Sequence, residues 1–371
     1  MKIAHKCDLY LSALEPSGDL HGAEILKHLY PYALSIHGAG GPKMRKQGFR
    51  VHFFAEDFNI MGFLDVAKAF PKLFRLFKQT LSTILELNPK VVFLIDYPGF
   101  HIKLAKALRK RGYTGKIVQY VCPSVWAWKK NRIYTIAENF DTLLTLFAFE
   151  PKYFEGLPIK ARFIGHPLVK SISSQVLHRA KEDDLIAIFP GSRKKEILRN
   201  LPIQLKACAA LKKMHPSIKI VISASDPQTE KLISKLNNDR YPIIPHEKNY
   251  WLMQRASIAI ATSGTVTLEL ALHGVPTIVT YGISRLDQFI ATKIFNINLP
   301  FWCIANIVLN RGLFPELIGT NLTSFSLLKE LTLLYENQES RPTTADFFEL
   351  KEKLGGLDAP HESSQEIIHL L

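Results

Sequence analysis

Short apolar runs alternate with amphipathic stretches along most of the chain. Val91–Ile95 is apolar at every position, which is typical of a parallel strand buried on both faces. Helical patterns of about 10–15 residues separate such runs. We therefore predict an α/β protein built from right-handed β–α–β units with parallel sheets. The other predicted strands cover residues 7–14, 35–39, 116–121, 142–146, 161–164, 185–189, 219–223, 257–261 and 275–281.

Two similar strand-to-helix turns mark the beginnings of two halves. Residues 15–19 (EPSGD) and 190–193 (PGSR) each follow an apolar run and open a helical pattern. A chain of 371 residues also exceeds a single ordinary hydrophobic core. We therefore predict two Rossmann-like domains, at 1–170 and 171–340, that face each other across a cleft. We treat 341–371 as a helical tail, for which a return to the first domain is one option.

The small residues in both turns predict anion binding. They let backbone N–H groups at the start of a helix point outward, where the helix dipole favours a negative charge. Two such turns in separate halves are typical of enzymes that bind a nucleoside-diphosphate donor in one half and an acceptor in the other.

The chain carries a formal net charge of +14. Such a charge attracts nucleic acid, anionic membranes or phosphorylated substrates, although a basic surface without a special partner would give the same number. The charge is spread along the chain, and no helix-turn-helix, RNP or zinc-finger pattern organises it. We therefore expect no nucleic-acid partner.

The four cysteines, Cys7, Cys122, Cys208 and Cys303, are far apart and form no CxxC pair. This spacing argues against a zinc site and a disulfide framework, so we expect reduced, mostly buried thiols, no metal and a cytosolic protein. No apolar run reaches the ~18 residues that a membrane-spanning helix needs. The first 14 residues are too short and too charged for a signal peptide.

Asp96 directly follows the predicted strand Val91–Ile95. Open α/β sheets bind ligands at the carboxyl ends of their strands, and a carboxylate there could deprotonate a hydroxyl nucleophile. An aspartate that caps the next turn is the alternative. Glu15 and Asp19, which flank the first turn, are equally plausible as bases, helix caps or hydroxyl acceptors.

In the second half, Ser192 and Arg193 come straight after a strand and open a helix. The guanidinium and the backbone N–H donors could converge on a diphosphate. A solvated arginine, in one run with Lys194 and Lys195, is the alternative.

A second phosphate and sugar candidate follows the strand at 257–261. Ser263, Gly264 and Thr265 open a helix, and Glu269 lies one turn further in, where its carboxylate could accept both hydroxyls of a ribose. A simple capping box needs the same residue types at nearly this spacing and is the alternative.

Two tryptophans, Trp126 and Trp128, lie in the segment 123–128 (PSVWAW) beside a predicted strand end. Packing in the core or at a domain interface is the usual role of such side chains. We assign that role to at least one of them, and we keep Trp126 as a candidate for the lining of the cleft.

Residues 70–85 form an amphipathic helical pattern. The apolar face carries Phe70, Phe74, Phe77, Leu81 and Ile84, whereas Lys72 and Arg75 lie opposite. Such a helix either buries its stripe in the domain or lies in an anionic membrane interface, which would also account for part of the net charge.

These motifs together resemble those of the lipid-A-disaccharide synthases, inverting glycosyltransferases with two Rossmann-like domains (the GT-B fold). The resemblance runs from about residue 9 to residue 317, and the PSVWAW segment makes it specific. The pattern at 263–269 alone is shared with other UDP-sugar transferases. The matching segments are 15–19 (EPSGD), 40–44 (GGPKM), 61–62 (MG), 95–98 (IDYP), 123–128 (PSVWAW), 165–168 (GHPL), 190–193 (PGSR) with Glu196, 263–269 (SGTVTLE), 306–307 (NI) and 315–317 (PEL).

The resemblance implies that UDP-2,3-diacylglucosamine and 2,3-diacylglucosamine 1-phosphate condense to a β-1,6-linked disaccharide 1-phosphate and UDP, with inversion. No cofactor or metal is implied. Asp96 would deprotonate the acceptor 6-hydroxyl, Arg193 with the Ser192 backbone would hold the diphosphate, and Glu269 would bind the ribose. Asn306 and Glu316 would line the donor pocket with Ser263, Gly264 and Thr265. The acceptor side of the cleft would contain Glu15, Ser17, Gly18, Asp19, Met61 and Trp126.

Both implied substrates are acylated. The resemblance therefore implies a protein on the cytoplasmic face of the inner membrane, in contact with anionic lipids through the helix of Phe70, Phe74 and Phe77. A homodimer is compatible with the resemblance.

Some positions depart from the family pattern. Gly99 and His101 replace an aspartate and an asparagine after Asp96, so we do not carry those two positions over as functional. Leu14, Pro16, Ala148 and Ala305 also differ from the residues usual there. These changes affect local geometry rather than the implied reaction class.

Two other functions compete with this interpretation. Another GT-B enzyme, such as a peptidoglycan-type transferase or an epimerase, would use an unacylated UDP-amino sugar. A basic membrane- or nucleic-acid-binding protein that retains the fold would have no activity to lose, and salt would abolish its binding.

Overall fold

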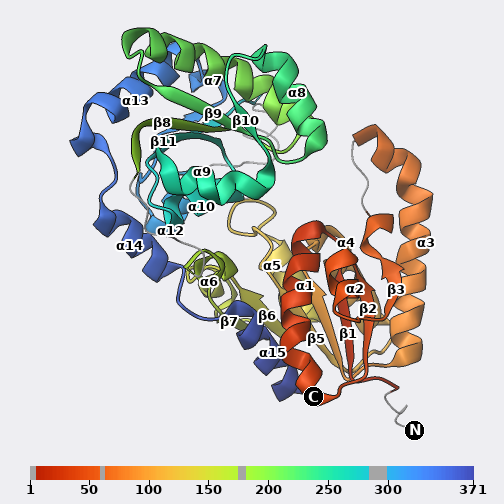
Figure 1. Ribbon diagram of the computed structural model, residues 1–371. Coiled ribbons are helices and arrows are strands. Elements are labelled where there is room, and N and C mark those ends of the chain that lie inside the picture. The colour runs from red at the N-terminus through yellow and green to blue at the C-terminus, as the bar shows by residue number, and fades with distance from the viewer. Residues whose placement is uncertain (1–5, 59–62, 174–180, 284–298) are drawn as a thin grey trace. The chain divides into compact units, whose positions relative to one another are not determined.

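The computed structural model describes residues 6–58, 63–173, 181–283 and 299–371, and for 63–70 it describes the helix but not the side chains (Figure 1). The chain divides into two compact units. One comprises Met1–Pro167 with Leu357–Leu371, and the other comprises Leu168–Gly356. Each unit has a parallel sheet with helices on both faces, which confirms the predicted fold class.

In the described part of the first unit, a seven-stranded parallel sheet has the order β3-β2-β1-β4-β5-β6-β7. The order reverses between β1 and β4, which pair from Leu9↔Val91 to Ala13↔Ile95. Sheets of this kind bind ligands at such a reversal, outside the carboxyl ends of the strands. The strands are β1 (Leu9–Ala13), β2 (Ile36–Gly40), β3 (Val51–Phe54), β4 (Val91–Ile95), β5 (Lys116–Tyr120), β6 (Thr142–Thr145) and β7 (Lys160–Phe163).

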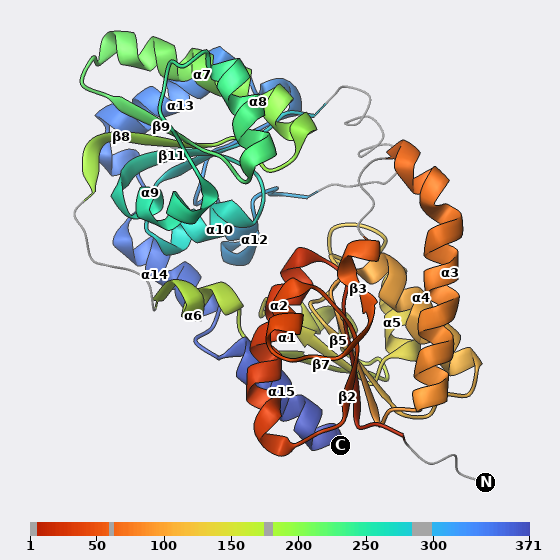
Figure 2. The same cartoon turned by 45° about the vertical axis from the view of Figure 1, so that its right-hand side comes forward.

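Two groups of helices cover the two faces of this sheet (Figure 2). One face, with Leu11 and Phe93, is covered by α1 and α15, which pack against each other. The other face, with Val92 and Leu94, is covered by α3, α4 and α5. The helices are α1 (Pro16–Leu29), α2 (Pro42–Lys46), α3 (Phe63–Leu87), α4 (Pro98–Lys110), α5 (Arg132–Asn139) and α15 (Ala359–Leu370).

Ion pairs attach α15 to β7. Lys160 Nζ lies 2.9 Å from Oε1 of the buried Glu366, and Arg162 pairs with Glu362. The structure therefore differs from the predicted boundary at 341, because residues 341–356 belong to the second unit and only the last segment belongs to the first. The sequence pattern is helical on both sides of residue 341, so it does not indicate that the boundary between the two units lies at 356/357.

In the described part of the second unit, a six-stranded parallel sheet has the order β10-β9-β8-β11-β12-β13. Here the order reverses between β8 and β11, which pair up to Phe189↔Ala261. The predicted phosphate turns at 190–193 and 263–265 directly follow β8 and β11. The two turns therefore lie next to each other at this reversal. The strands are β8 (Glu182–Phe189), β9 (Lys219–Ser223), β10 (Ile243–Ile244), β11 (Ala256–Thr262), β12 (Thr277–Tyr281) and β13 (Glu316–Ile318).

The second sheet is also covered on both faces. The helices α7, α8 and α13 bury one face together with Ile186 and Ile258, and α9 and α10 bury the other with Ala187 and Ala259. α12 and α14 pack against α10. The helices are α6 (Pro167–Ser173), α7 (Lys194–Met214), α8 (Pro227–Asn237), α9 (Asn249–Arg255), α10 (Thr265–Leu272), α12 (Ile304–Leu309), α13 (Ser324–Glu336) and α14 (Thr344–Lys353).

Candidate functional site

Asp96 and the first turn come together at the strand reversal of the first sheet. Asp96 directly follows β4, and the neighbouring strand β1 leads into Glu15 and α1. The Ser17 hydroxyl is close enough to the Asp96 carboxylate to lower its pKa. The pKa of Tyr97 is raised, mainly by burial and also by the charge of Glu15. Glu15 therefore lies near Tyr97, the residue that follows Asp96. Three predicted candidates thus share one place.

The backbone at Asp96 is unusual. Asp96 and Tyr97 both have left-handed conformations, with φ of 53° and 49°. Such conformations persist only where the surroundings enforce them. The Asp96 N–H donates to Tyr120 O at 2.9 Å, and Asp96 O accepts from His101 Nδ1 at 2.7 Å and Gln119 Nε2 at 3.1 Å. Two buried side chains therefore fix the position of Asp96.

The environment of Asp96 suits a base. Burial raises the pKa of its carboxyl group, and hydrogen bonds from the Tyr97 backbone and the Ser17 hydroxyl lower it in part. A carboxylate with a raised pKa accepts a proton more readily. A perturbed carboxyl group at a strand reversal marks a candidate functional site.

Asp19 has a structural partner rather than an open site. It is 3% exposed, and its two carboxylate oxygens accept the N–H groups of Gly41, Lys43 and Met44 at 2.9–3.0 Å. The carboxylate caps α2, and a Cβ at position 41 would lie 2.6 Å from it. Of the three alternatives for Asp19, the structure therefore favours a helix cap, although of α2 rather than of α1. Gly18 is buried against Ile95, so its role is also packing.

Trp126 lies in the loop between β5 and α5 and is half-buried. Its indole Nε1 donates to Glu150 Oε1 at 3.3 Å, and its ring meets Phe149 edge to face at 5.4 Å between centroids. Trp128 lies under Lys129 and Arg132, which stack over its ring. The two tryptophans thus have different surroundings, a carboxylate and a phenyl ring for Trp126 and two cationic side chains for Trp128, which the sequence did not predict.

The first phosphate turn of the second unit has a left-handed glycine. Gly191 has φ of 111°, which disfavours any side chain. Arg193 is the N-cap residue of α7, and its side chain is 80% exposed. Arg193 Nη1 lies 2.7 Å from Glu196 Oε1, and Glu196 Oε2 accepts the Arg193 N–H at 3.4 Å. Glu196 thus holds the guanidinium at the start of the helix, where Ser192 is also exposed.

Buried amides of α7 join this turn to the neighbouring strand ends. Asn200 Nδ2 donates to Thr262 Oγ1 at 3.0 Å, and Asn200 Oδ1 accepts the Gly282 N–H at 2.7 Å. Gln204 Nε2 donates to Thr280 Oγ1 at 2.9 Å. Neither residue was predicted from the sequence, although two amides four residues apart on the buried face of a helix are a recognisable signal.

The second phosphate turn begins α10. Gly264 is its N-cap residue and Thr265 its first residue, and both are exposed. Ser263 Oγ donates to Trp302 O at 3.2 Å. Glu269 is mostly buried, and Tyr250 OH donates to its Oε1 at 3.1 Å. Burial raises the pKa of Glu269, while the Tyr250 hydrogen bond and the nearby His246 lower it.

Asn306 and Glu316 line a cavity of about 350 Å³ within the second unit. Glu316 accepts the N–H groups of Trp302 and Cys303 at 2.8–3.1 Å, so it caps α12, and it also accepts from Asn306 Nδ2 at 2.8 Å. Trp302 lines the same cavity and accepts the Ser263 hydrogen bond. The predicted pair is therefore brought together beside the second phosphate turn.

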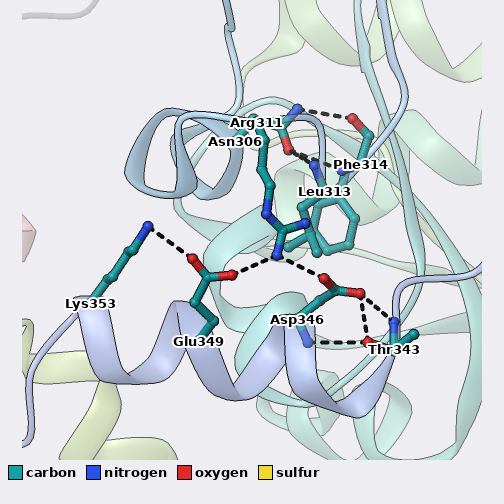
Figure 3. Close-up of polar contacts among 8 residues, drawn as sticks. All are labelled: Asn306, Arg311, Leu313, Phe314, Thr343, Asp346, Glu349 and Lys353. Atoms are coloured by element: carbon teal, nitrogen blue, oxygen red, sulfur yellow. Dashed lines mark hydrogen bonds and ion pairs between the residues drawn. The ribbon is translucent and has the colours of Figure 1, made fainter.

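A polar network fixes one wall of this cavity (Figure 3). Asn306 Oδ1 accepts the N–H groups of Leu313 and Phe314, each at 2.9 Å, which closes the turn after α12. Within this turn, Arg311 Nη2 lies 2.7 Å from both Asp346 and Glu349 of α14. The wall is thereby attached to a helix that sequence analysis placed in a separate tail.

The amphipathic helix α3 is divided between core and surface. Leu76, Leu81 and Ile84 are buried, and Phe77 is half-buried and packs edge to face on Phe100, which favours burial in the domain for this part of the apolar face. Phe74 is 50% exposed, with Lys78 Nζ 4.6 Å from its ring centroid. Lys72 and Arg75 are exposed as predicted. Met61 and the side chain of Phe70 lie outside the described residues.

Three further findings concern metal ligands, membrane-spanning helices and cysteines. Among the described residues, no group of three or more His, Cys, Asp or Glu side chains could hold a metal ion. No helix within the described ranges is both long and apolar enough to span a membrane. All four cysteines are free and buried, as predicted.

Comparison with known proteins decides the family. The family model of lipid-A-disaccharide synthetases matches residues 9–366. The chain belongs to this family. It is 42% identical over 327 residues to the lipid-A-disaccharide synthase of Chlamydia muridarum. The matched region covers 84% of this chain but only 54% of that protein. The chain thus spans about half the length of the chlamydial relatives.

A more distant relative matches over nearly its whole length. The lipid-A-disaccharide synthase of Paramagnetospirillum magneticum is 31% identical over 350 residues, which is 91% of this chain and 90% of that protein. Among solved structures, a UDP-N-acetylglucosamine 2-epimerase from Listeria monocytogenes, described as putative, has a TM-score of 0.60 at 13% identity and covers 99% of this chain and 95% of its own. The spinosyn rhamnosyltransferase with bound thymidine diphosphate also has a TM-score of 0.60, at 12% identity, and the match covers 98% of this chain and 100% of that one. These two likenesses establish the shared fold.

Proposed function

We propose that this protein is a glycosyltransferase that transfers 2,3-diacylglucosamine from UDP to the 6-hydroxyl of 2,3-diacylglucosamine 1-phosphate. The products are a β-1,6-linked disaccharide 1-phosphate and UDP, with inversion at the anomeric carbon. The observation that carries the proposal is the fixed, half-buried Asp96 at the strand reversal of the first unit, in a chain of this family.

In the proposed reaction, the Asp96 carboxylate takes the proton of the acceptor 6-hydroxyl. The resulting oxygen nucleophile attacks the anomeric carbon, and the bond from that carbon to the β-phosphate oxygen breaks. A base of this kind contributes about 10²–10⁴-fold to the rate. Attack from the face opposite the leaving group gives inversion.

The leaving UDP gains negative charge, and the second unit supplies the groups to stabilise it. Arg193 and the exposed start of α7 offer a guanidinium and a helix N-terminus. Glu269, held through one oxygen by Tyr250, keeps its other oxygen for the ribose hydroxyls. The cavity bounded by Trp302, Asn306 and Glu316 suits the base of the nucleotide.

We also propose that the protein works on the cytoplasmic face of the inner membrane, without spanning it. Both substrates carry acyl chains that favour a bilayer. Exposed Phe74 beside Lys72, Arg75 and Lys78 on α3 fits contact with anionic lipid headgroups.

The deciding experiment measures UDP release from UDP-2,3-diacylglucosamine in detergent, with and without 2,3-diacylglucosamine 1-phosphate. We expect release only with both acylated substrates, together with a disaccharide phosphate product. Turnover only with UDP-N-acetylglucosamine would instead favour another enzyme of the GT-B fold. No turnover with either donor would favour a binding protein.

A further inference from the structure

We propose that Glu150 is a positioning residue that fixes the Trp126 indole as a wall of the acceptor site. This inference rests on the proposed function, because the acceptor is the sugar phosphate named there. It assigns a role to a buried acid that the proposed chemistry does not use.

Glu150 is a buried carboxylate whose oxygens are divided between two loops. It is 2% exposed. Its Oε2 accepts the N–H groups of Leu146 and Phe147, at 3.2 and 3.1 Å, directly after β6. Its Oε1 accepts from Trp126 Nε1 at 3.3 Å, in the loop after β5. The carboxylate therefore joins the loops that follow two neighbouring strands.

The burial of Glu150 is costly, so its hydrogen bonds matter. Burial raises the pKa of Glu150 to about 7, although hydrogen bonds from Phe147, Trp126, Leu146 and Cys122 oppose the rise. Removal of one donor from a buried charged group costs about 1–3 kcal/mol. The hydrogen bonds to Trp126, Leu146 and Phe147 offset part of the cost of burying the carboxylate, and they hold both loops in fixed positions.

Trp126 is held at both ends but not covered. The Glu150 hydrogen bond fixes its indole nitrogen, and the edge-to-face contact with Phe149 fixes its ring. Phe149 itself stacks on Phe147, with 5.6 Å between centroids and 9° between planes. All three rings are only half-buried. A fixed, partly exposed indole presents a flat apolar surface with few rotatable bonds.

The position of this indole relates it to the acceptor. Its loop follows β5, which pairs with β4 up to Ile95↔Tyr120, and Asp96 directly follows β4. Both therefore lie at the carboxyl edge of the same sheet, where ligands of such sheets bind. Rigid side chains at a binding site are held by residues behind them. Glu150 holds the Trp126 indole from behind in this way.

The kinetic test uses Trp126→Phe, Glu150→Gln and the double variant, in mixed micelles at a fixed ratio of detergent to lipid. We expect each single variant to raise KM for the acceptor about tenfold and to leave KM for the donor within about twofold. In Glu150→Gln the single carbonyl oxygen should stay with the two backbone N–H groups, so the amide NH₂ faces Trp126. The double variant should then be no worse than the worse single variant, because both changes remove the same hydrogen bond. Trp128→Phe and the exposed Glu155→Gln are the matched controls and should match the wild type.

A spectroscopic test does not depend on turnover. In a protein labelled with ¹⁵N, Trp126→Phe identifies the Trp126 indole N–H signal. We expect Glu150→Gln to move that signal and leave the indole signals of Trp128, Trp251 and Trp302 in place, and the acceptor alone to move it in the wild type.

The outcomes separate the two proposals. If the Trp126 signal responds to Glu150→Gln and to the acceptor while the wild type makes no disaccharide, the proposed function fails and the positioning role stands. Unchanged acceptor KM in both single variants, additive effects in the double variant, or an indole signal that ignores the acceptor would each overturn the positioning role.

Discussion

His101 Nδ1 lies 2.7 Å from the backbone carbonyl oxygen of Asp96. A carbonyl oxygen only accepts, so Nδ1 carries the hydrogen, and Nε2 accepts from the Ser12 hydroxyl at 3.0 Å. Burial lowers the pKa of His101 to about 4, so this neutral tautomer persists at neutral pH. The histidine therefore fixes the left-handed backbone of Asp96 without adding charge beside the carboxylate.

The first prediction concerns the base itself. We expect Asp96→Asn to fold normally, to bind UDP as the wild type does and to lose about 10²–10⁴-fold in kcat, because the amide cannot accept a proton. In the wild type, kcat should fall as the pH drops through the raised pKa of Asp96, since only the ionised form is a base. Turnover against pH and UDP titration calorimetry measure both. Full activity of Asp96→Asn would refute the assignment.

The second prediction concerns His101 and stability. The folded state keeps His101 neutral down to about pH 4, whereas an unfolded histidine takes up a proton near pH 6.5. Stability from this residue is therefore complete above pH 6.5 and is lost as the pH falls towards 4, by about 3 kcal/mol.

Because His101→Asn removes this titration, its stability relative to the wild type should improve as the pH falls from 7 to 4. Urea unfolding at several pH values gives the difference, with the exposed His361→Asn as control. A difference that is independent of pH would contradict the buried neutral histidine.

The third prediction concerns the diphosphate. We expect Arg193→Ala to weaken UDP binding about tenfold or more, because a charged guanidinium at the start of α7 is lost. Lys195→Ala removes a neighbouring exposed charge and should have little effect, which separates a specific contact from general attraction. Titration calorimetry with UDP measures the affinities of both variants. Equal affinities in the two variants would rule out the diphosphate role of Arg193.

The fourth prediction concerns Asp19. We expect Asp19→Asn to lower the free energy of unfolding by about 1–3 kcal/mol, because one backbone N–H that binds the carboxylate then faces an amide NH₂. At a temperature where the variant is folded, both KM values should stay near those of the wild type. Denaturant unfolding together with steady-state kinetics makes the test. Normal stability with a lost rate would return Asp19 to the reacting groups.

The fifth prediction concerns membrane contact. We expect Lys72→Glu with Arg75→Glu to reduce binding to vesicles with anionic lipid at least tenfold, at about 1 kcal/mol for each basic residue. Lys206→Glu with Lys213→Glu makes the same change of charge on the exposed side of α7 and is the control. Vesicle sedimentation measures the bound fraction. An equal loss in both variants would mean that net charge, rather than α3, decides binding.

The sequence by itself determined the fold class and the two halves. Val91–Ile95 and Lys219–Ser223 were predicted with their observed bounds, because a buried parallel strand must be apolar on both faces. Val51–Phe54 and Ile243–Ile244 were missed, since short edge strands are too brief to show a period. The turns at Glu15 and Arg193 were found because helix starts need particular small and polar residues.

Only the tertiary structure decided which candidates belong together. The strand order, which periodicity does not encode, places Asp96 beside the first turn and directs Asp19 to α2 instead. Glu150 and His101 acquire their roles partly from residues on other strands or loops, Trp126 and Ser12 respectively. A side chain's neighbours set its pKa and its hydrogen bonds, and those neighbours exist only once the sheet has formed.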